Sequence, residues 1–148
     1  MTIPQNDVAR LQTEAAQREL IERELTARFA PDDAELRAAN ERARAAGMPE
    51  IQISPIQGKL LQVLAVACGA RKILEIGALA GYSGAWLARA LPPDGKLITL
   101  EVSAKHAEVA RATFAAAGVT ERVDLRVGPA LETLPTLTSE APFDLIFI

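Results

Sequence analysis

The sequence has few of the residues that mark several common protein classes. Its 148 residues include one cysteine, one histidine and one tryptophan, and aromatic residues make up only 4%. Cys68 has no second cysteine with which to form an internal disulfide, and the sequence has no Cys/His cluster of the kind that binds zinc. We therefore expect the reducing environment of the cytoplasm.

Basic residues and long apolar runs are scarce as well. Lysine and arginine number 16 against 19 acidic residues, a formal net charge of −3. Nucleic acids and anionic membranes attract proteins with a basic surplus, so we expect neither as a partner. The most apolar stretch, residues 60–70, contains Gln62 and is too short to span a bilayer. The first ten residues lack the basic and apolar segments of a signal peptide. A small-molecule ligand remains compatible with this composition.

What is present is the composition of a globular protein, with 49% hydrophobic and 24% charged residues. The length predicts one domain, which we divide into an N-terminal helical segment, residues 1–50, and a ligand-binding portion, residues 51–148. Helical periodicity predicts a first helix over 7–29, and Pro31 is expected to open a second, with Asp32 and Asp33 in its first turn. A capping-box pattern over 54–57 predicts a third helix that ends at residue 67 or 68.

The hydrophobic pattern changes after residue 70. Four short aliphatic runs alternate with helical patterns; the runs are residues 72–76, 96–101, 122–127 and 143–148, and the helical patterns are 83–91, 105–117 and 130–137. Alternating strands and helices predict an α/β fold whose parallel sheet is covered on both faces.

Two strand ends in this predicted sheet carry chemically distinctive residues. Gly77 and Gly81 allow a tight turn after the first strand, and the helix that follows offers free N–H groups near Ser83. Glu101 ends the next strand, where a carboxylate can accept hydrogen bonds from ribose hydroxyls. Because ligands bind beyond the carboxyl ends of parallel strands, we expect a nucleoside here.

The residues of the turn discriminate between nucleosides. In a dinucleotide-binding turn the second glycine makes room for pyrophosphate, and here Leu79 occupies that position. Glu75, at the end of the first strand, would repel a pyrophosphate but favour the ammonium and sulfonium groups of S-adenosylmethionine. The pattern favours S-adenosylmethionine over NAD; an ordinary strand-to-helix turn is the alternative for the glycines, and a solvated charge is the alternative for Glu101.

Several motifs in order resemble one family. ISPIQGKLLQ, KILEIGALAGYSGAWLARALP, GKLITLEVSAKHAEVAR, VGPALETLP and FDLIFI resemble the cation-dependent O-methyltransferases of the catechol and caffeoyl-CoA type, in particular small bacterial members. The resemblance covers residues 51–148. It implies a Rossmann-like class I methyltransferase fold, with the first four strands in the order 3-2-1-4, and methyl transfer to a phenolic, often catechol-type, hydroxyl.

The resemblance also implies a set of cofactor-binding residues. Glu75, Gly77 and Ala78 would line the methionine part of the cofactor, Ser83 would help hold its carboxylate, and Glu101 would hold the ribose. The remaining positions belong to the turn, to the adenine edge and to the segment over the cofactor; they are Gly81, Gly128, Pro129, Ala130 and Ile53.

The family also uses a divalent cation, usually Mg²⁺, and here the sequence departs from the pattern. The metal-ligating aspartate and catalytic lysine of the family follow the strand that FDLIFI resembles, whereas this sequence ends at Ile148. Asp144 is expected at the far end of its strand and is no substitute. We therefore expect no metal ligands and no catalytic residues here: a cofactor-binding portion, truncated before the later strands, that alone does not catalyse metal-dependent transfer. The alternatives are an inactive S-adenosylmethionine- or S-adenosylhomocysteine-binding or oligomerisation module and, less favoured, an NAD-binding oxidoreductase domain.

Four further features receive plain structural interpretations. His106 is expected to be a solvated helix position, Cys68 a buried inert thiol and Trp86 part of the core. The last strand, residues 143–148, is expected to expose an apolar edge. That edge predicts a homo-oligomer, in the simplest case a dimer, or coverage by the N-terminal helices.

Overall fold

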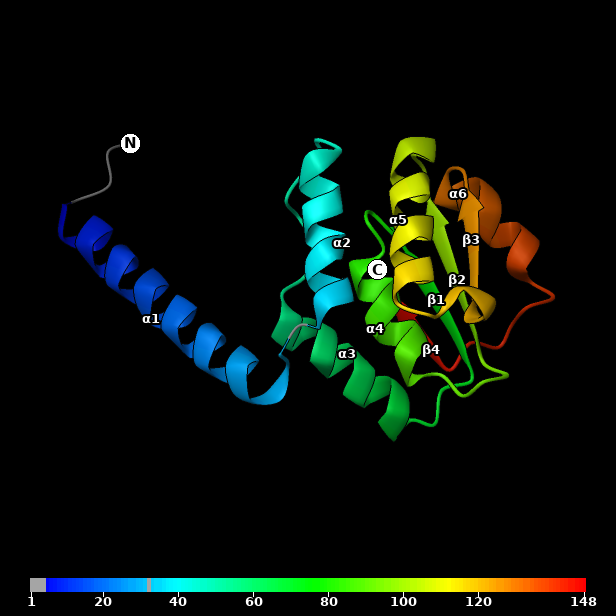
Figure 1. The fold of residues 1–148 in the computed structure, drawn as a ribbon, viewed down its shortest axis with the longest axis horizontal. Helices are drawn as coiled ribbons and strands as arrows, with labels where there is room; N and C mark the ends of the chain where they lie inside the picture. The colour runs from blue at the N-terminus through cyan, green and yellow to red at the C-terminus, as the bar shows by residue number, and fades with distance from the viewer. Residues whose placement is uncertain (1–4, 32) are drawn as a thin grey trace.

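A computed structural model gives the fold of residues 5–31 and 33–148, with side chains described from residue 13 onward. The helices α1 to α3 come first, and α4 to α6 then alternate with the four strands (Figure 1). The α-helices are Gln5–Phe29, Ala34–Ala45, Pro55–Ala67, Tyr82–Ala90, Ala104–Ala116 and Ala130–Thr133. The strands β1 to β4 are Lys72–Ile76, Lys96–Glu101, Val123–Val127 and Leu145–Phe147, and short 3-10 helices span Thr120–Arg122 and Leu134–Leu137.

The strands form one parallel sheet in the order β3-β2-β1-β4, which confirms the predicted class and order. β1 pairs with β2 from Lys72↔Lys96 to Ile76↔Leu100, so both strands end at the same edge. β4 pairs with the other side of β1 in parallel. This register brings the turn after β1 beside Glu101 at the end of β2.

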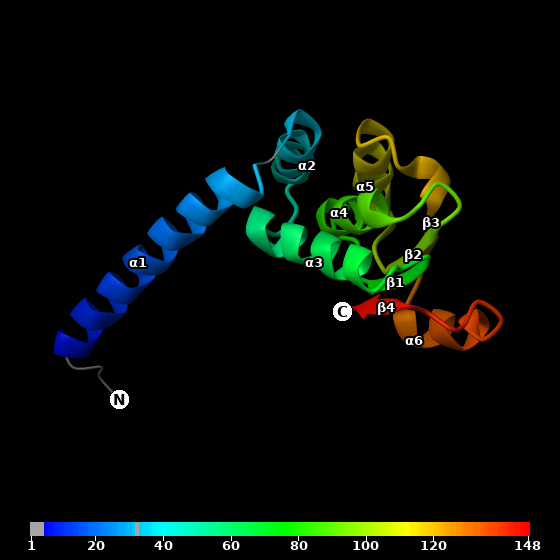
Figure 2. The same cartoon turned by 90° about the horizontal axis from the view of Figure 1, so that it is seen from below.

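Helices cover the two faces of the sheet unequally. Figure 2 shows α3, α4 and α5 on one face and α6 on the other. The larger buried cluster lies under α3 to α5 and includes Ile73, Leu87, Leu97 and Phe114. The smaller cluster, on the α6 face, is built from Leu74, Ile98, Leu100 and Leu137.

Two helix boundaries differ from the sequence expectation. α2 begins at Ala34 rather than Pro31, because Asp33 is its N-cap and accepts the Leu36 N–H at 3.0 Å. Asp32 lies outside the described residues. The helix expected over 130–137 divides at Leu134 into a short α-helix and a 3-10 helix, where Pro135 has no N–H to continue the ladder.

The N-terminal helices do not cover β4. α1 projects away from the rest of the domain, and α2 packs on the side of α4 and α5 (Figures 1 and 2). Ile146 is 57% exposed and Ile148 is 84% exposed. The prediction that the N-terminal helices cover the last strand is therefore wrong, whereas the predicted exposed apolar edge is present. Within the described ranges no helix is long and apolar enough to cross a membrane. The division at residue 50 stays a prediction.

Candidate functional site

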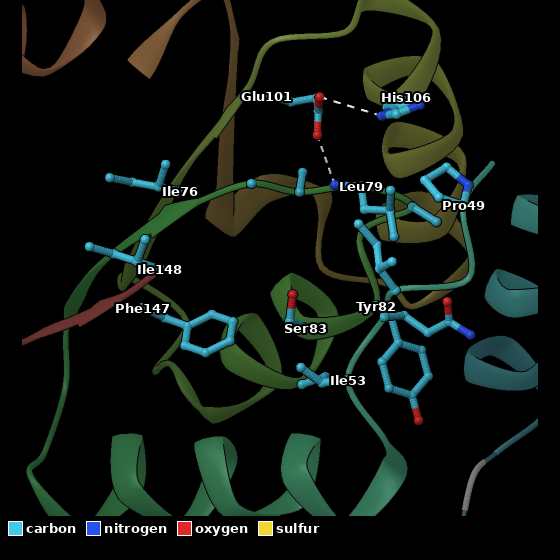
Figure 3. A pocket seen from close by; sticks show the side chains of 15 residues that line it. Pro49, Ile53, Ile76, Leu79, Tyr82, Ser83, Glu101, His106, Phe147 and Ile148 are labelled. Carbon is cyan, nitrogen blue, oxygen red and sulfur yellow. Dashed lines mark hydrogen bonds and ion pairs between the residues drawn. The ribbon is translucent and has the colours of Figure 1, made fainter. Parts of the chain in front are cut away.

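A cavity of about 460 Å³ lies where β1, β2 and β4 end (Figure 3). The turn after β1, the segment before α3, the first turns of α4 and α5 and the end of β4 all contribute to its wall. The lining residues are Pro49, Ile51, Gln52, Ile53, Ile76, Gly77, Ala78, Leu79, Ala80, Tyr82, Ser83, Glu101, His106, Phe147 and Ile148. The cavity is mostly apolar, with polar side chains at a few positions, as small-molecule sites usually are.

The turn between β1 and α4 takes an unusual backbone course. Gly77 has φ +100° and Leu79 has φ +48°. A left-handed conformation costs a non-glycine residue about 1 to 2 kcal/mol. Two hydrogen bonds help hold the turn: the Gly77 N–H donates to the Leu100 carbonyl at 2.7 Å, and the Leu79 N–H donates to Glu101 Oε2 at 2.8 Å. The turn is thus fastened to the end of β2.

Glu101 is the organising carboxylate of the wall. Glu101 is only 5% exposed. Its Oε2 accepts the Leu79 N–H, and its Oε1 accepts the Ser103 N–H at 2.8 Å. A carboxylate oxygen can accept more than one hydrogen bond. Glu101 therefore holds the turn while keeping capacity for hydroxyl groups in the cavity.

His106 lies beside Glu101 on the wall, so its interpretation as a solvated helix position was wrong. Its Nδ1 is 3.5 Å from Glu101 Oε1, and its side chain is only 25% exposed (Figure 3). The cause is the start of α5, where Ser103 Oγ accepts the His106 N–H at 3.3 Å and directs the first turn over the end of β2. The serine two residues after Glu101 was the available sequence signal for this placement.

Glu75 lies beneath the cavity and is not on its wall. It is fully buried, and its oxygens accept hydrogen bonds from Ser83 Oγ at 2.5 Å and Thr99 Oγ1 at 2.6 Å. The pKa of Glu75 is raised to about 7. Burial is the largest cause, the hydrogen bonds from Ser83 and Thr99 oppose it, and the charge of Glu101 adds to it. Ser83, which does line the cavity, stands between Glu75 and the ligand space, and the place of Glu75 beside the methionine part of the cofactor stays a prediction.

The structure separates the other predicted site residues into two groups. Ile53, Gly77, Ala78, Ser83 and Glu101 lie together on the cavity wall. Outside the wall lie Gly81, which caps α4, and the turn after β3 with Gly128, Pro129 and Ala130. The Gly128 N–H donates to the Glu101 carbonyl at 2.9 Å, so this turn is joined to the same strand end.

Two other expectations have opposite outcomes. Trp86 is 5% exposed and packs with Leu36 and Tyr82, which confirms its place in the core. Cys68 is exposed rather than buried, because it follows the last turn of α3 as the C-cap residue.

The described residues do not provide a metal centre. Among the side chains of residues 13–31 and 33–148, no three from His, Cys, Asp or Glu converge as cation ligands. Asp144 sits at the opposite end of the sheet, where it accepts the N–H groups of Arg71 and Lys72, both at 2.8 Å.

The sheet order, the glycine turn and the acidic strand ends define a Rossmann-like α/β protein with a nucleoside-type site. Comparison with known proteins identifies the family. The sequence profile of the O-methyltransferase family matches residues 27–148, and the chain belongs to that family.

Individual relatives agree with this assignment. A catechol O-methyltransferase of Niastella koreensis is 56% identical over 119 residues, which cover 79% of this chain and 53% of that protein. The chain thus spans about half the length of the curated relatives it matches.

Solved structures share the fold. The O-methyltransferase TomG of Streptomyces achromogenes, in complex with S-adenosylmethionine, superposes with a TM-score of 0.82 at 44% identity, covering 86% of this chain and 58% of that one. An O-methyltransferase from Bacillus cereus, in complex with S-adenosylhomocysteine, gives 0.83 at 43% identity, covering 87% and 60%.

Proposed function

We propose that the cavity binds S-adenosylmethionine and that the chain is the cofactor-binding portion of an O-methyltransferase. The observation that carries this proposal is Glu101, a nearly buried carboxylate that closes the cavity wall and fastens the left-handed turn at Leu79. The complexes of the similar enzymes with S-adenosylmethionine and S-adenosylhomocysteine support it.

The residues of the wall have distinct roles in this proposal. Glu101 accepts hydrogen bonds from the ribose hydroxyls, and the first N–H groups of α4 face the ligand carboxylate. Gly77 and Ala78 let the backbone approach the methionine part, and Ile53 packs over the cofactor. Gly128, Pro129 and Ala130 remain proposed neighbours of the adenine, one strand further along the sheet edge.

The bound cofactor supplies an electrophilic methyl group. When bound, it would give this methyl group to an acceptor oxygen whose hydroxyl proton has passed to the solvent, and it would leave as S-adenosylhomocysteine, with the electron pair of the broken carbon–sulfur bond on sulfur. We propose a phenolic acceptor of the catechol type, as the name of the similar Niastella enzyme suggests. We propose the transfer activity, the phenolic acceptor and the use of Mg²⁺, which the family resemblance implies, for the whole protein of which this chain is a portion.

A second candidate function is a non-catalytic module that binds the cofactor or its product. The lack of converging metal ligands among the described residues favours it for this chain. An NAD-binding domain is disfavoured because Leu79 fills the position that pyrophosphate would need.

We further propose that the protein forms a homodimer. Apolar side chains are exposed along α1, at Leu20, Ile21, Leu25 and Phe29, and at the β4 edge. The free, exposed thiol of Cys68 supports a reducing compartment, and hence the cytoplasm, as the location.

Isothermal titration of the chain with S-adenosylmethionine, S-adenosylhomocysteine and NAD tests the proposed site. We expect binding of the first two and none of NAD. Glu101→Gln should weaken binding of both sulfur nucleosides roughly 10- to 100-fold, the range expected for a lost hydrogen bond to a charged group. Glu108→Gln removes the same charge from an exposed position on α5 and should bind as the wild type does. Binding of NAD alone, or an unchanged affinity in Glu101→Gln, would contradict the proposal.

A further inference from the structure

Beneath the cavity three side chains form a continuous hydrogen-bonded unit. Thr99 Oγ1 donates to Glu75 Oε2 at 2.6 Å, and Ser83 Oγ donates to Glu75 Oε1 at 2.5 Å. Thr99 and Glu75 are completely buried, whereas Ser83 reaches the cavity wall. The unit therefore connects the interior of the sheet to the ligand space through a single hydroxyl group.

The surroundings of Glu75 contain no compensating positive charge among the described groups that act on it. From α4 it meets Ser83 and the backbone at Gly84, where an added Cβ would lie 3.0 Å from Glu75 Oε2. From β2 it meets Thr99, and the one charged group that acts on it is Glu101, another carboxylate. A positive charge on a ligand in the cavity would therefore stabilise the ionised form of Glu75, which no described positive side chain does.

The protonation state of Glu75 also determines what Ser83 offers to the cavity. When Glu75 is ionised it can only accept, so the Ser83 hydroxyl donates inward and presents its lone pairs to the cavity. When Glu75 is protonated it can donate to Ser83, which frees the hydroxyl to donate outward. Lone pairs suit an ammonium or sulfonium group. The carboxylate that Ser83 is expected to help hold is then bound by the Ser83 backbone N–H, in the first turn of α4, and not by its hydroxyl.

We propose that the Thr99–Glu75–Ser83 unit is a specificity device that favours a positively charged ligand over its neutral product by releasing a proton from Glu75 to the solvent on binding. The inference rests on the proposed function. S-adenosylmethionine carries an ammonium, a carboxylate and a sulfonium, a net charge of +1, whereas in S-adenosylhomocysteine the sulfonium is a neutral thioether. Glu75 and Ser83 determine the preference between these ligands, and Thr99 is a positioning residue that stabilises the ionised form.

The size of the effect follows from the pKa of Glu75. With a pKa of about 7, Glu75 is close to half ionised in the free protein at neutral pH. A ligand that lowers this pKa by one unit would release about 0.4 proton at pH 7. The same ligand would bind roughly tenfold more tightly well above that pKa than well below it.

Calorimetric titration in two buffers of different ionisation enthalpy, phosphate and Tris, measures the proton directly. For the wild-type chain we expect release of about 0.4 proton per S-adenosylmethionine at pH 7 and clearly less per S-adenosylhomocysteine. From pH 6 to pH 8 the affinity ratio of the two ligands should rise several-fold in favour of S-adenosylmethionine. Glu75→Gln should show the same proton count for both ligands and a ratio that does not vary with pH.

Thr99→Val distinguishes positioning from mere packing. The isosteric valine removes a hydrogen bond to the ionised carboxylate, so the rise in the affinity ratio should move to higher pH while both ligands still bind. Glu108→Gln, exposed on α5, should retain the wild-type proton count and pH profile. Equal proton counts for the two ligands in the wild type, or a Glu75→Gln profile identical to the wild type, would overturn the inference. Absence of binding by either ligand would instead refute the proposed function.

Discussion

At the scale of single residues, Glu75 makes the stability of the fold depend on pH. Its carboxyl group is completely buried without a cation in contact, and its pKa is raised from an ordinary value of 4.5 to about 7. The folded state therefore binds the proton more tightly than the unfolded state does. The stability that this group contributes is fully present below pH 4.5 and is lost as the pH rises through 7.

Glu75→Gln should remove this pH dependence. The free energy of unfolding of the variant, relative to the wild type, should increase by about 2.5 kcal/mol between pH 5 and pH 8. The wild type loses about that much over this range, because its Glu75 has a pKa of about 7 when folded and 4.5 when unfolded. Urea unfolding at a series of pH values measures the difference, and Glu108→Gln serves as the exposed control. A difference that stays constant from pH 5 to pH 8 would contradict the assignment.

Single-residue placements were the hardest part to predict from the sequence. The residue types of Glu75, Ser83 and Glu101 indicated a polar site at the strand ends, and Ser83 and Glu101 do line the cavity. The burial of Glu75 and the approach of His106 to Glu101 depend on how α4 and α5 pack on the sheet. Periodicity along one chain contains no information about such contacts.

At the scale of elements, local signals located the helices and strands well. Ser54 and Gln57 form the capping box that was predicted for α3, with the Ser54 N–H donating to Gln57 Oε1 at 2.8 Å. Expectations failed where a side chain competed with the pattern, as Asp33 does at the start of α2 and Pro135 does within the helix after β3. The strand order came from the family resemblance, because alternation of strands and helices leaves the order open.

The contact between α3 and α4 depends on Gly58, which has no side chain. A Cβ on Gly58 would lie 2.3 Å from Trp86 Cδ1 and 2.4 Å from Trp86 Nε1, so the glycine makes room for the indole. Gly58→Ala should therefore overpack this contact and lower the free energy of unfolding by roughly 1 to 3 kcal/mol. The gain in helix propensity, about 1 kcal/mol, offsets only part of that cost.

Thermal unfolding of Gly58→Ala measures this loss. Val66→Ala, at a side chain that is 62% exposed on the same helix, is the control and should unfold near the wild-type temperature. An unchanged or higher melting temperature for Gly58→Ala would show that the indole can move aside.

At the scale of the whole molecule, α1 is the helix that packs least against the rest of the domain. It projects from the body in both views, and Leu25 and Phe29 are 39% and 59% exposed (Figures 1 and 2). Burying such side chains stabilises association by about 25 cal/mol per Å² of apolar surface. This exposure supports the proposed homodimer.

Replacing Leu25 and Phe29 together by serine should shift the chain from dimer to monomer. Light scattering coupled to size exclusion measures the mass, and circular dichroism confirms that the helix content is retained. Leu131→Ser, at a side chain that is 85% exposed on α6, should leave the mass unchanged. A wild-type chain that is monomeric at all concentrations would rule out the dimer.

The burial of Trp86 gives the molecule a built-in optical reporter. This indole is the only one in the sequence, and the cluster in which it lies also packs against Ile53, a residue of the cavity wall. Occupation of the cavity that displaces Ile53 would change the polarity around the ring, and the emission maximum would shift in wavelength. Stopped-flow fluorescence would then follow ligand arrival in real time, with no dye attached and no second emitting indole to subtract.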